Sequence, residues 1–383
     1  MIYLDHAATS YPKSPAVMRA VHEALRCYGA NPGRGGYPMA MAASEQLYRC
    51  RETAAALFDM TDERRVVLTP SCTQALNLVL HSLLAHGGRA LTSDMEHNAV
   101  MRPLHALCPH RIDVAPVTVG DDDATVEAFR RRITPYTRVL VCTHASNVIG
   151  NVLPIARLAA LAHANGIPIV VDAAQSAGHV PLRVETDALD YVCVAGHKGL
   201  GGPMGTGLLL CRDDTPLLPL IYGGTGHASL SLQQPPDLPE RLESGTPNVA
   251  GFCGLRAGMD EMRRVGVEAV ARRETELSRE LYERLDGIRG VRLHSPYPQT
   301  AQTVSVLSVT VDDMDTDTLA SALAACGVAV RGGLHCAPAA HRHLGTLPLG
   351  TVRLSVGVTN TPQEMRICAE ILKKIAANPL HFG

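Results

Sequence analysis

The chain has 383 residues, of which 46% are hydrophobic, so it can bury a large core and is long enough for two domains. Its formal net charge of -2 at pH 7 gives no electrostatic reason to expect a nucleic acid or a membrane surface as a partner. It starts without a basic or apolar leader and has no apolar run of membrane-spanning length, so we expect a soluble, cytoplasmic protein that acts on small molecules.

The 11 cysteines are scattered through apparent strands and helices. No pair of them forms a CxxC motif, and nothing in the sequence indicates secretion. We therefore expect most of them to be small buried thiols, and we expect no metal site.

Short apolar segments alternate with amphipathic or alanine-rich segments from about residue 16 to residue 255. The predicted strands are 65–68, 90–92, 139–142, 167–171, 191–194 and 207–210. This alternation predicts an α/β domain with a mostly parallel sheet covered by helices. Residues 213–239 are rich in proline, glycine and serine, and they indicate an extended loop.

A different pattern follows. A helix is predicted for residues 266–285, because Leu277, Leu281 and Leu285 fall on one face. Strands are then predicted at 291–293, 304–311, 328–330 and 352–356, and helices at 315–326 and 361–377. We expect residues 256–383, together with residues 1–15, to form a smaller α+β domain beside a large domain of residues 16–255.

Lys198 has the most informative surroundings in the chain. It follows the apolar run 191–195 and precedes Gly-Leu-Gly-Gly, where small residues allow close approach of the backbone. An amine in a dry pocket has a lowered pKa and can form a Schiff base with an aldehyde, which is how enzymes hold pyridoxal phosphate (PLP). The alternative is a lysine that caps a helix or faces a phosphate in another kind of α/β protein.

Asp172 ends a second buried strand and is followed by small residues and Gln175. PLP needs such a carboxylate, because its pyridine nitrogen must stay protonated to draw electrons from the substrate. Taken alone, Asp172 is also a common kind of helix N-cap.

Three further segments follow predicted strands. Residues 71–73 lead into a helix whose free N–H groups suit a phosphate, although Ser71 or Thr73 could be ordinary caps. His97 could stack on a flat ring, or it could be a solvated loop residue. Asn147 could reach the cofactor's phenolic oxygen or a substrate carboxylate, or it could mark a turn.

With these residues in view, the chain resembles the class V aminotransferase family of fold-type I PLP enzymes. Within that family it is similar to the cysteine desulfurases, especially the SufS-like branch that includes selenocysteine lyases. The resemblance covers nearly the whole chain and is carried by residues 3–9, 71–77, 96–98, 144–150, 172–179, 196–205, 243–248, 331–337 and 352–361.

The resemblance implies roles for particular residues. Lys198 matches the Schiff-base lysine, Asp172 the partner of the pyridine nitrogen, and Gln175 the donor to the phenolic oxygen. The other implied positions are the stacking imidazole His97, the phosphate-binding Cys72, Thr73 and His197, the substrate-binding Asn147, Arg331 and Arg353, and the sulfur-accepting Cys336. Thr246 matches a threonine that reaches the phosphate from the neighbouring subunit, so a homodimer is implied.

The chain departs from the SufS-like pattern in the loop at residues 223–227, in the Gly-Leu-Gly-Gly stretch after Lys198 and at three single positions. Ala195 replaces a usual serine and Cys72 a common threonine, which leaves fewer hydroxyls for a phosphate. Thr359 replaces a frequent tyrosine.

Cys336 lies between two predicted strands on a short loop that contains Arg331 and His335. These cations would favour the thiolate, whereas the alternative is a cysteine that merely packs.

The prediction is a PLP-dependent cysteine desulfurase that converts L-cysteine to L-alanine, with a persulfide on Cys336 passed to an acceptor protein. The alternatives are a selenocysteine lyase, another C–S lyase or aminotransferase of the family, and a catalytically silent binding module.

Overall fold

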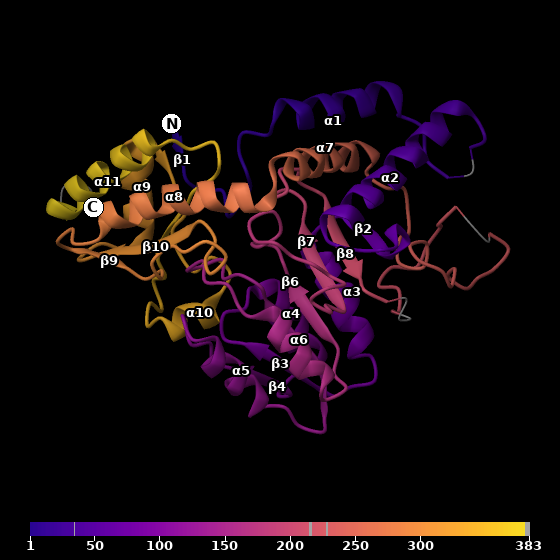
Figure 1. Ribbon diagram of the computed structural model, residues 1–383, viewed down its shortest axis with the longest axis horizontal. Coiled ribbons are helices and arrows are strands. Elements are labelled where there is room, and N and C mark those ends of the chain that lie inside the picture. Colours follow the sequence, from indigo (N-terminus) through magenta and orange to yellow (C-terminus); the bar gives the residue numbers. More distant parts are fainter. Residues whose placement is uncertain (34, 214–216, 227–228, 380–383) are drawn as a thin grey trace.

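The computed structural model describes residues 1–33, 35–213, 217–226 and 229–379 (Figure 1). Its main sheet has seven strands in the order β2-β8-β7-β6-β5-β3-β4. Only β8 runs antiparallel to its neighbours, so the expected mostly parallel sheet is confirmed. The strands are β2 (Val66–Thr69), β3 (Arg89–Ser93), β4 (Ile112–Ala115), β5 (Thr137–Thr143), β6 (Ile169–Asp172), β7 (Tyr191–Ala195) and β8 (Gly207–Cys211).

Helices cover both faces of this sheet, and the alternation of side chains along each strand explains why. In β5, Leu140 packs in the core on one face, whereas Val139 and Val141 pack in the core on the other. Side chains of α3 and α4 complete the second core, and those of α2, α5, α6 and α7 complete the first. The helices of this part are α1 (Pro15–Cys27), α2 (Pro38–Leu57), α3 (Cys72–Leu83), α4 (Asn98–Leu107), α5 (Asp122–Arg130), α6 (Ile155–His163) and α7 (Val249–Val265), with a 3-10 turn η1 (Glu63–Arg65).

The C-terminal part has its own antiparallel sheet, β12-β10-β9, and its own core. Leu277, Leu281 and Leu285 are buried there, as the helix prediction requires. The elements are α8 (Val267–Leu285), β9 (Val291–Leu293), β10 (Val306–Val311), α9 (Thr316–Ala325), β11 (Val328–Ala329), α10 (Pro338–His343), β12 (Val352–Ser355) and α11 (Pro362–Ala377). In Figure 1, α8 leads away from the end of α7 toward α9 and α11.

The first residues of the chain join this C-terminal part. The short strand β1 (Ile2–Tyr3) pairs in parallel with β11, and Asp5 forms a β-bridge with Ser355, the last residue of β12. We continue to propose a division into one domain of residues 16–255 and another of residues 1–15 with 256–383. The separate C-terminal core is consistent with it, although Met259, Ala337 and Ala340 of the second range pack in a core of the main sheet.

The described residues of the loop expected at 213–239 contain neither helix nor strand. Within the described part of the chain, no helix is both long and apolar enough to cross a bilayer. The same residues contain no cluster of His, Cys, Asp or Glu side chains that could hold a metal ion. All 11 cysteines are free.

Candidate functional site

A pocket lies at the carboxyl edge of the main sheet, where β5, β6 and β7 end and where α3 and α4 begin. It gathers nearly all the residues that the sequence predicts for a cofactor. Its lining includes Ser71, Cys72, Thr73, His97, Thr143, Asn147, Asp172, Gln175, Ala195, His197 and Lys198. Parallel strands bring residues from distant parts of the chain together at this edge.

Lys198 follows β7 on a tight turn. A Cβ atom on Gly196 would lie 2.4 Å from the Thr206 hydroxyl oxygen, so only glycine fits at that position. The Lys198 amine has no hydrogen bond or ion pair with any described residue, whereas its carbonyl accepts the Gly201 N–H at 2.8 Å. Burial lowers the pKa of its amine, and the charge of Asp172 opposes this effect only in part. The neutral, nucleophilic form of the amine is therefore easier to reach than in a solvent-exposed lysine.

Asp172 is 3% exposed and forms no ion pair with a described side chain. Its Oδ1 accepts a hydrogen bond from the Ala174 N–H at 2.9 Å and another from the Cys72 thiol at 3.4 Å. Burial raises the pKa of Cys72 well above its ordinary value, so this thiol stays protonated and can donate. A buried carboxylate without a cation favours a positively charged ligand.

The first turn of α3 faces the same pocket. Ser71 is its N-cap and accepts the Gln74 N–H at 3.2 Å, which leaves the N–H groups of Cys72 and Thr73 without acceptors inside the helix. A Cβ atom on Gly207 would lie 2.6 Å from the Ser71 carbonyl carbon, so a glycine in β8 allows this approach. The turn can hold an anion with main-chain donors, although the Cys72 thiol is directed to Asp172.

His97 is the N-cap of α4, and its Nδ1 accepts the Ala99 N–H at 2.9 Å. Because Nδ1 is an acceptor, the proton of the neutral ring is on Nε2. Burial lowers the pKa of His97, with Asp172 acting in the opposite direction. The result is a neutral, flat ring at the pocket, which suits stacking.

Two other pocket residues are anchored by the N-terminal segment. The Gln175 Nε2 donates to the Ala7 carbonyl at 3.0 Å and keeps a second hydrogen for another acceptor. The His197 ring lies 3.1 Å from the Thr9 hydroxyl, and burial lowers the pKa of His197 to about 4.

Two residues that the sequence analysis missed also support the pocket. Lys13 donates to the His197 carbonyl at 2.8 Å, and burial lowers the pKa of Lys13 to about 8. Glu96 is fully buried and accepts the Thr143 N–H on both carboxyl oxygens, at 2.9 and 3.0 Å. Burial raises the pKa of Glu96 to about 8. The only sequence feature that could have pointed to Glu96 is its position directly before His97. No local feature could have pointed to Lys13, because its acceptor lies 184 residues away.

The expected substrate-binding residues meet beside this pocket. Arg353 is 3% exposed; it donates to the Asn147 carbonyl at 3.0 Å and to Asp5 Oδ1 at 3.1 Å. Its Nε is buried without a partner. Arg331 lies across a β-bridge from Arg353 and pairs with the other oxygen of Asp5 at 3.1 Å. Two guanidinium groups therefore share one carboxylate, which leaves donors for a second one.

Cys336 is exposed, so it does not pack in the core. Its carbonyl accepts the Asn98 N–H at 2.7 Å, and the His335 carbonyl accepts the Asn147 side chain at 2.7 Å. His335 and Cys336 have φ angles of 48° and 56°, which are left-handed and costly for residues other than glycine. The thiol is thus presented by a loop that the large domain holds in an unfavourable conformation.

One expectation about this loop is wrong. The sequence analysis assigned a positive charge to His335, but its buried ring donates to the Thr351 carbonyl at 3.0 Å. Burial lowers the pKa of His335 to about 3, so the ring is neutral at ordinary pH. Arg331 remains the cation of the loop, and its charge is shared with Asp5.

Thr246 does not line the Lys198 pocket. It is exposed, and it borders a separate cavity of about 810 Å³ together with Glu243 and Gly224. A role in a neighbouring subunit's site stays a prediction.

Residues 2–367 match the aminotransferase class-V family. The chain is 33% identical, over 98% of its length and 94% of the relative's, to a probable cysteine desulfurase of Methanothermobacter thermautotrophicus. It is 35% identical to another of Xylella fastidiosa, over 97% of this chain and 90% of the relative.

Solved structures of cysteine desulfurases are also similar to this chain. An apo cysteine desulfurase from Thermococcus onnurineus superimposes with a TM-score of 0.89 at 29% identity, covering 98% of this chain and 94% of that one. The cysteine desulfurase CsdA from Escherichia coli gives a TM-score of 0.86 at 26% identity, covering 97% and 94%. The chain therefore belongs to the class-V aminotransferase family, whose members depend on PLP.

Proposed function

We propose that this protein is a PLP-dependent cysteine desulfurase, which converts L-cysteine to L-alanine and passes the sulfur, as a persulfide on Cys336, to an acceptor protein. Relatives and solved structures named as cysteine desulfurases support this proposal. The observation that carries it is an exposed Cys336 at the edge of the Lys198 pocket. The Cys336 carbonyl accepts the Asn98 N–H, and the carbonyl of the preceding His335 accepts the Asn147 side chain.

The residues of the pocket fit PLP. Among the described residues, Asp172 is a buried carboxylate without an ion pair, and the amine of the half-buried Lys198 has no hydrogen bond or ion pair. Lys198 would hold the aldehyde carbon, Asp172 the pyridine nitrogen and Gln175 the phenolic oxygen. The first turn of α3 and His197 would hold the phosphate, and His97 would cover the ring. When bound, PLP supplies an electron sink that stabilises negative charge on the carbon atoms of the substrate.

The chain's own groups then act on L-cysteine in a defined order. Arg353 and Asn147 bind the substrate carboxylate, a natural bidentate partner for a guanidinium. Lys198, with its lowered pKa, removes the proton from Cα as a general base and later returns a proton to carbon.

Cys336 carries out the sulfur transfer. Its thiolate forms a bond to the substrate sulfur while the Cβ–S bond breaks, and the electron pair of that bond stays with Cβ. Cβ then takes up a proton on the way to alanine. The sulfur remains on Cys336 as a persulfide, within reach of an acceptor because the residue is exposed.

We also propose a homodimer in which Thr246 reaches the partner subunit's phosphate site. The exposure of Thr246 and its place on a cavity other than the Lys198 pocket are consistent with this proposal. A cytoplasmic location is supported by 11 free cysteines, because exposed thiols stay reduced in that compartment.

A product assay on L-cysteine tests the proposed function. We expect alanine, with one sulfur transferred or released per alanine, in the PLP-loaded protein. Pyruvate as the product would indicate another kind of C–S lyase. Turnover of L-selenocysteine but not of L-cysteine would indicate a selenocysteine lyase, and no turnover at all would indicate a binding module.

A further inference from the structure

A buried ion pair lies behind the lysine-bearing turn. His179 Nδ1 is 2.7 Å from Glu274 Oε2, and the two side chains are 16% and 5% exposed. His179 ends the segment that contains Asp172 and Gln175, whereas Glu274 lies on α8. The pair therefore joins the cofactor segment of the large domain to the C-terminal part of the chain. The functions proposed above do not use it.

The imidazole side of this pair touches the residue that follows Lys198. A Cβ atom on Gly199 would lie 2.7 Å from two atoms of the His179 ring and 2.3 Å from the Ala177 carbonyl oxygen. The main chain at Gly199 thus packs directly on the imidazole. Because the Lys198 amine has no hydrogen bond with a described residue, its position depends on where this main chain is held.

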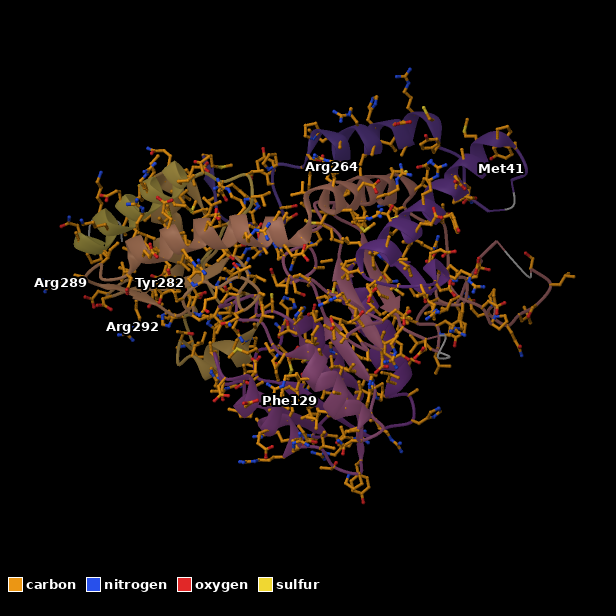
Figure 2. All side chains as sticks on the ribbon, in the orientation of Figure 1. Met41, Phe129, Arg264, Tyr282, Arg289 and Arg292 are labelled. Atoms are coloured by element: carbon orange, nitrogen blue, oxygen red, sulfur yellow. The ribbon has the colours of Figure 1, made fainter. Side chains whose placement is uncertain are left out.

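On the side of Lys198 that faces His179 and Glu274, packing alone does not hold the lysine in place. A cavity of about 540 Å³ borders Lys198, His179 and Glu274, and it extends to Arg264 near the end of α7. Figure 2 labels Arg264 at that end of the helix. With open space next to the lysine, the ion pair is a fixed contact that limits movement of the turn.

The carboxylate side of the pair connects to the substrate-binding strand. Ser305 Oγ is 3.4 Å from Glu274 Oε2 and donates to the Val356 carbonyl at 2.7 Å. Val356 directly follows β12, the strand that contains Arg353. A continuous set of contacts therefore runs from Gly199 to the strand that binds the substrate carboxylate.

The contact with Glu274 favours the protonated form of the His179 ring. Burial lowers the pKa of His179, but the charge and the hydrogen bond of Glu274 together raise it above its ordinary value. A buried charge that loses its partner is strongly destabilised, so the two groups act as one unit.

We propose that His179 and Glu274 form a positioning pair, which sets where the Lys198 amine stands relative to Arg353 and Cys336. The kinetic part of this inference rests on the proposed function, but the placement of Lys198 does not. Reactions of bound groups are sensitive to shifts of about 1 Å, which can cost roughly 100-fold in rate.

The test compares His179→Gln, Glu274→Gln and the double variant, all loaded with PLP. The control is His163→Gln, which breaks another His–carboxylate pair, 2.8 Å from Asp190 and before the start of β7, at the opposite end of that strand from Lys198. Bound PLP absorbs visible light, and the pH at which its absorbance changes reports the ionisation of its link to Lys198. The second readout is kcat and KM for L-cysteine.

In both single variants we expect the absorbance midpoint to move by at least ~0.5 pH unit and kcat to fall ~10- to 100-fold, with KM within about threefold of wild type. The double variant should be no worse than the worse single variant, because the pair acts as a unit. The control should change neither readout.

Variants that melt at a lower temperature but keep the wild-type absorbance midpoint and kcat would show that the pair only stabilises the fold. Additive losses of kcat in the double variant would also overturn the inference. If the wild-type protein made no alanine from L-cysteine, the proposed function would fail while the absorbance midpoint still tested the pair.

Discussion

Burial sets the charge state of the individual residues at the pocket. It lowers the pKa of Lys198, and it leaves Asp172 with two hydrogen-bond donors and no described cation. An amine and a carboxylate that line one pocket suit the aldehyde and the pyridine nitrogen of pyridoxal phosphate. This match explains why the chain needs these residue types at these strand ends.

Asp172→Asn should leave PLP bound but slow the reaction, because a neutral amide cannot keep the pyridine nitrogen protonated. Losing a paired charge at a reacting centre costs several kcal/mol, so we expect alanine formation to fall at least ~100-fold. The rate is measured under saturating L-cysteine, with PLP content checked by absorbance. A near-normal rate would show that Asp172 is only structural.

The sequence could identify the residues that do chemistry because each follows a strand and precedes a turn. Lys198, Asp172, His97 and Asn147 do meet in one pocket. The charge state of His335 could not be predicted in this way, because it depends on burial and on the Thr351 carbonyl. The contribution of Lys13 could not be predicted either, since it depends on a contact between distant parts of the chain.

At the scale of elements, the first turn of α4 has two tasks. It presents His97, and its first N–H holds the Cys336 carbonyl at 2.7 Å. Because Asn98 is the first residue of the helix, its N–H has no acceptor within α4. The helix start therefore fixes the stacking residue and the nucleophile relative to each other.

Asn98→Pro tests this arrangement with a small change. Proline is favoured at the first helical position, and the extended conformation of His97, with φ -74° and ψ 154°, suits a residue before proline. The substitution removes the N–H and places the proline ring against the Cys336 carbonyl. We expect persulfide formation to fall ~10- to 100-fold with PLP still bound.

Asn98→Ala is the matched control, because it keeps the N–H; its persulfide rate should stay near wild type. Equal rates in the proline and alanine variants would show that this hydrogen bond does not position Cys336.

The pattern of elements was largely predictable, and the main exception is physically clear. Strand β4 (Ile112–Ala115) was missed, because it lies at the sheet edge and has a half-exposed, interrupted apolar pattern. Strands β5, β6 and β7 are apolar on both faces and could be recognised directly. No sequence pattern near Cys336 predicted the hydrogen bonds that Asn98 and Asn147 make to the main chain of its loop.

At the scale of the whole molecule, buried histidines make stability depend on pH. Burial is the main cause that lowers the pKa of His144 and His341 to about 4 and that of His335 to about 3. Because these pKa values lie below the unfolded value, the unfolded chain takes up more protons as the pH falls. Stability is therefore complete above about pH 6.5 and is lost as the pH falls toward 4. Glu96, with a pKa of about 8, acts in the opposite direction.

We expect the free energy of unfolding to fall between pH 7 and pH 5, with each histidine contributing on the order of 2 kcal/mol. Urea unfolding at the two pH values measures the difference. His144→Gln should reduce the difference, because it removes one titrating group; an unchanged difference would contradict the assignment.

The proposed dimer makes a separate prediction. Thr246→Ala should weaken PLP binding in the partner subunit, so a mixture of inactive Lys198→Ala and Thr246→Ala chains should regain activity in heterodimers. Each heterodimer would then contain one intact site. Proven heterodimers without any gain, despite a clear Thr246→Ala defect, would argue against shared sites.

The central claim is that Cys336 receives sulfur from L-cysteine, and mass spectrometry of the PLP-loaded protein after a single exposure to L-cysteine tests it most directly. We predict one added sulfur atom on the peptide that contains Cys336, none on the exposed Cys27 and Cys326, and one alanine formed per sulfur. Cys336→Ser should keep its PLP and gain no sulfur, because a serine hydroxyl cannot accept sulfur as a persulfide. Wild-type rates of alanine formation in Cys336→Ser, or sulfur found on another cysteine in place of Cys336, would contradict the account.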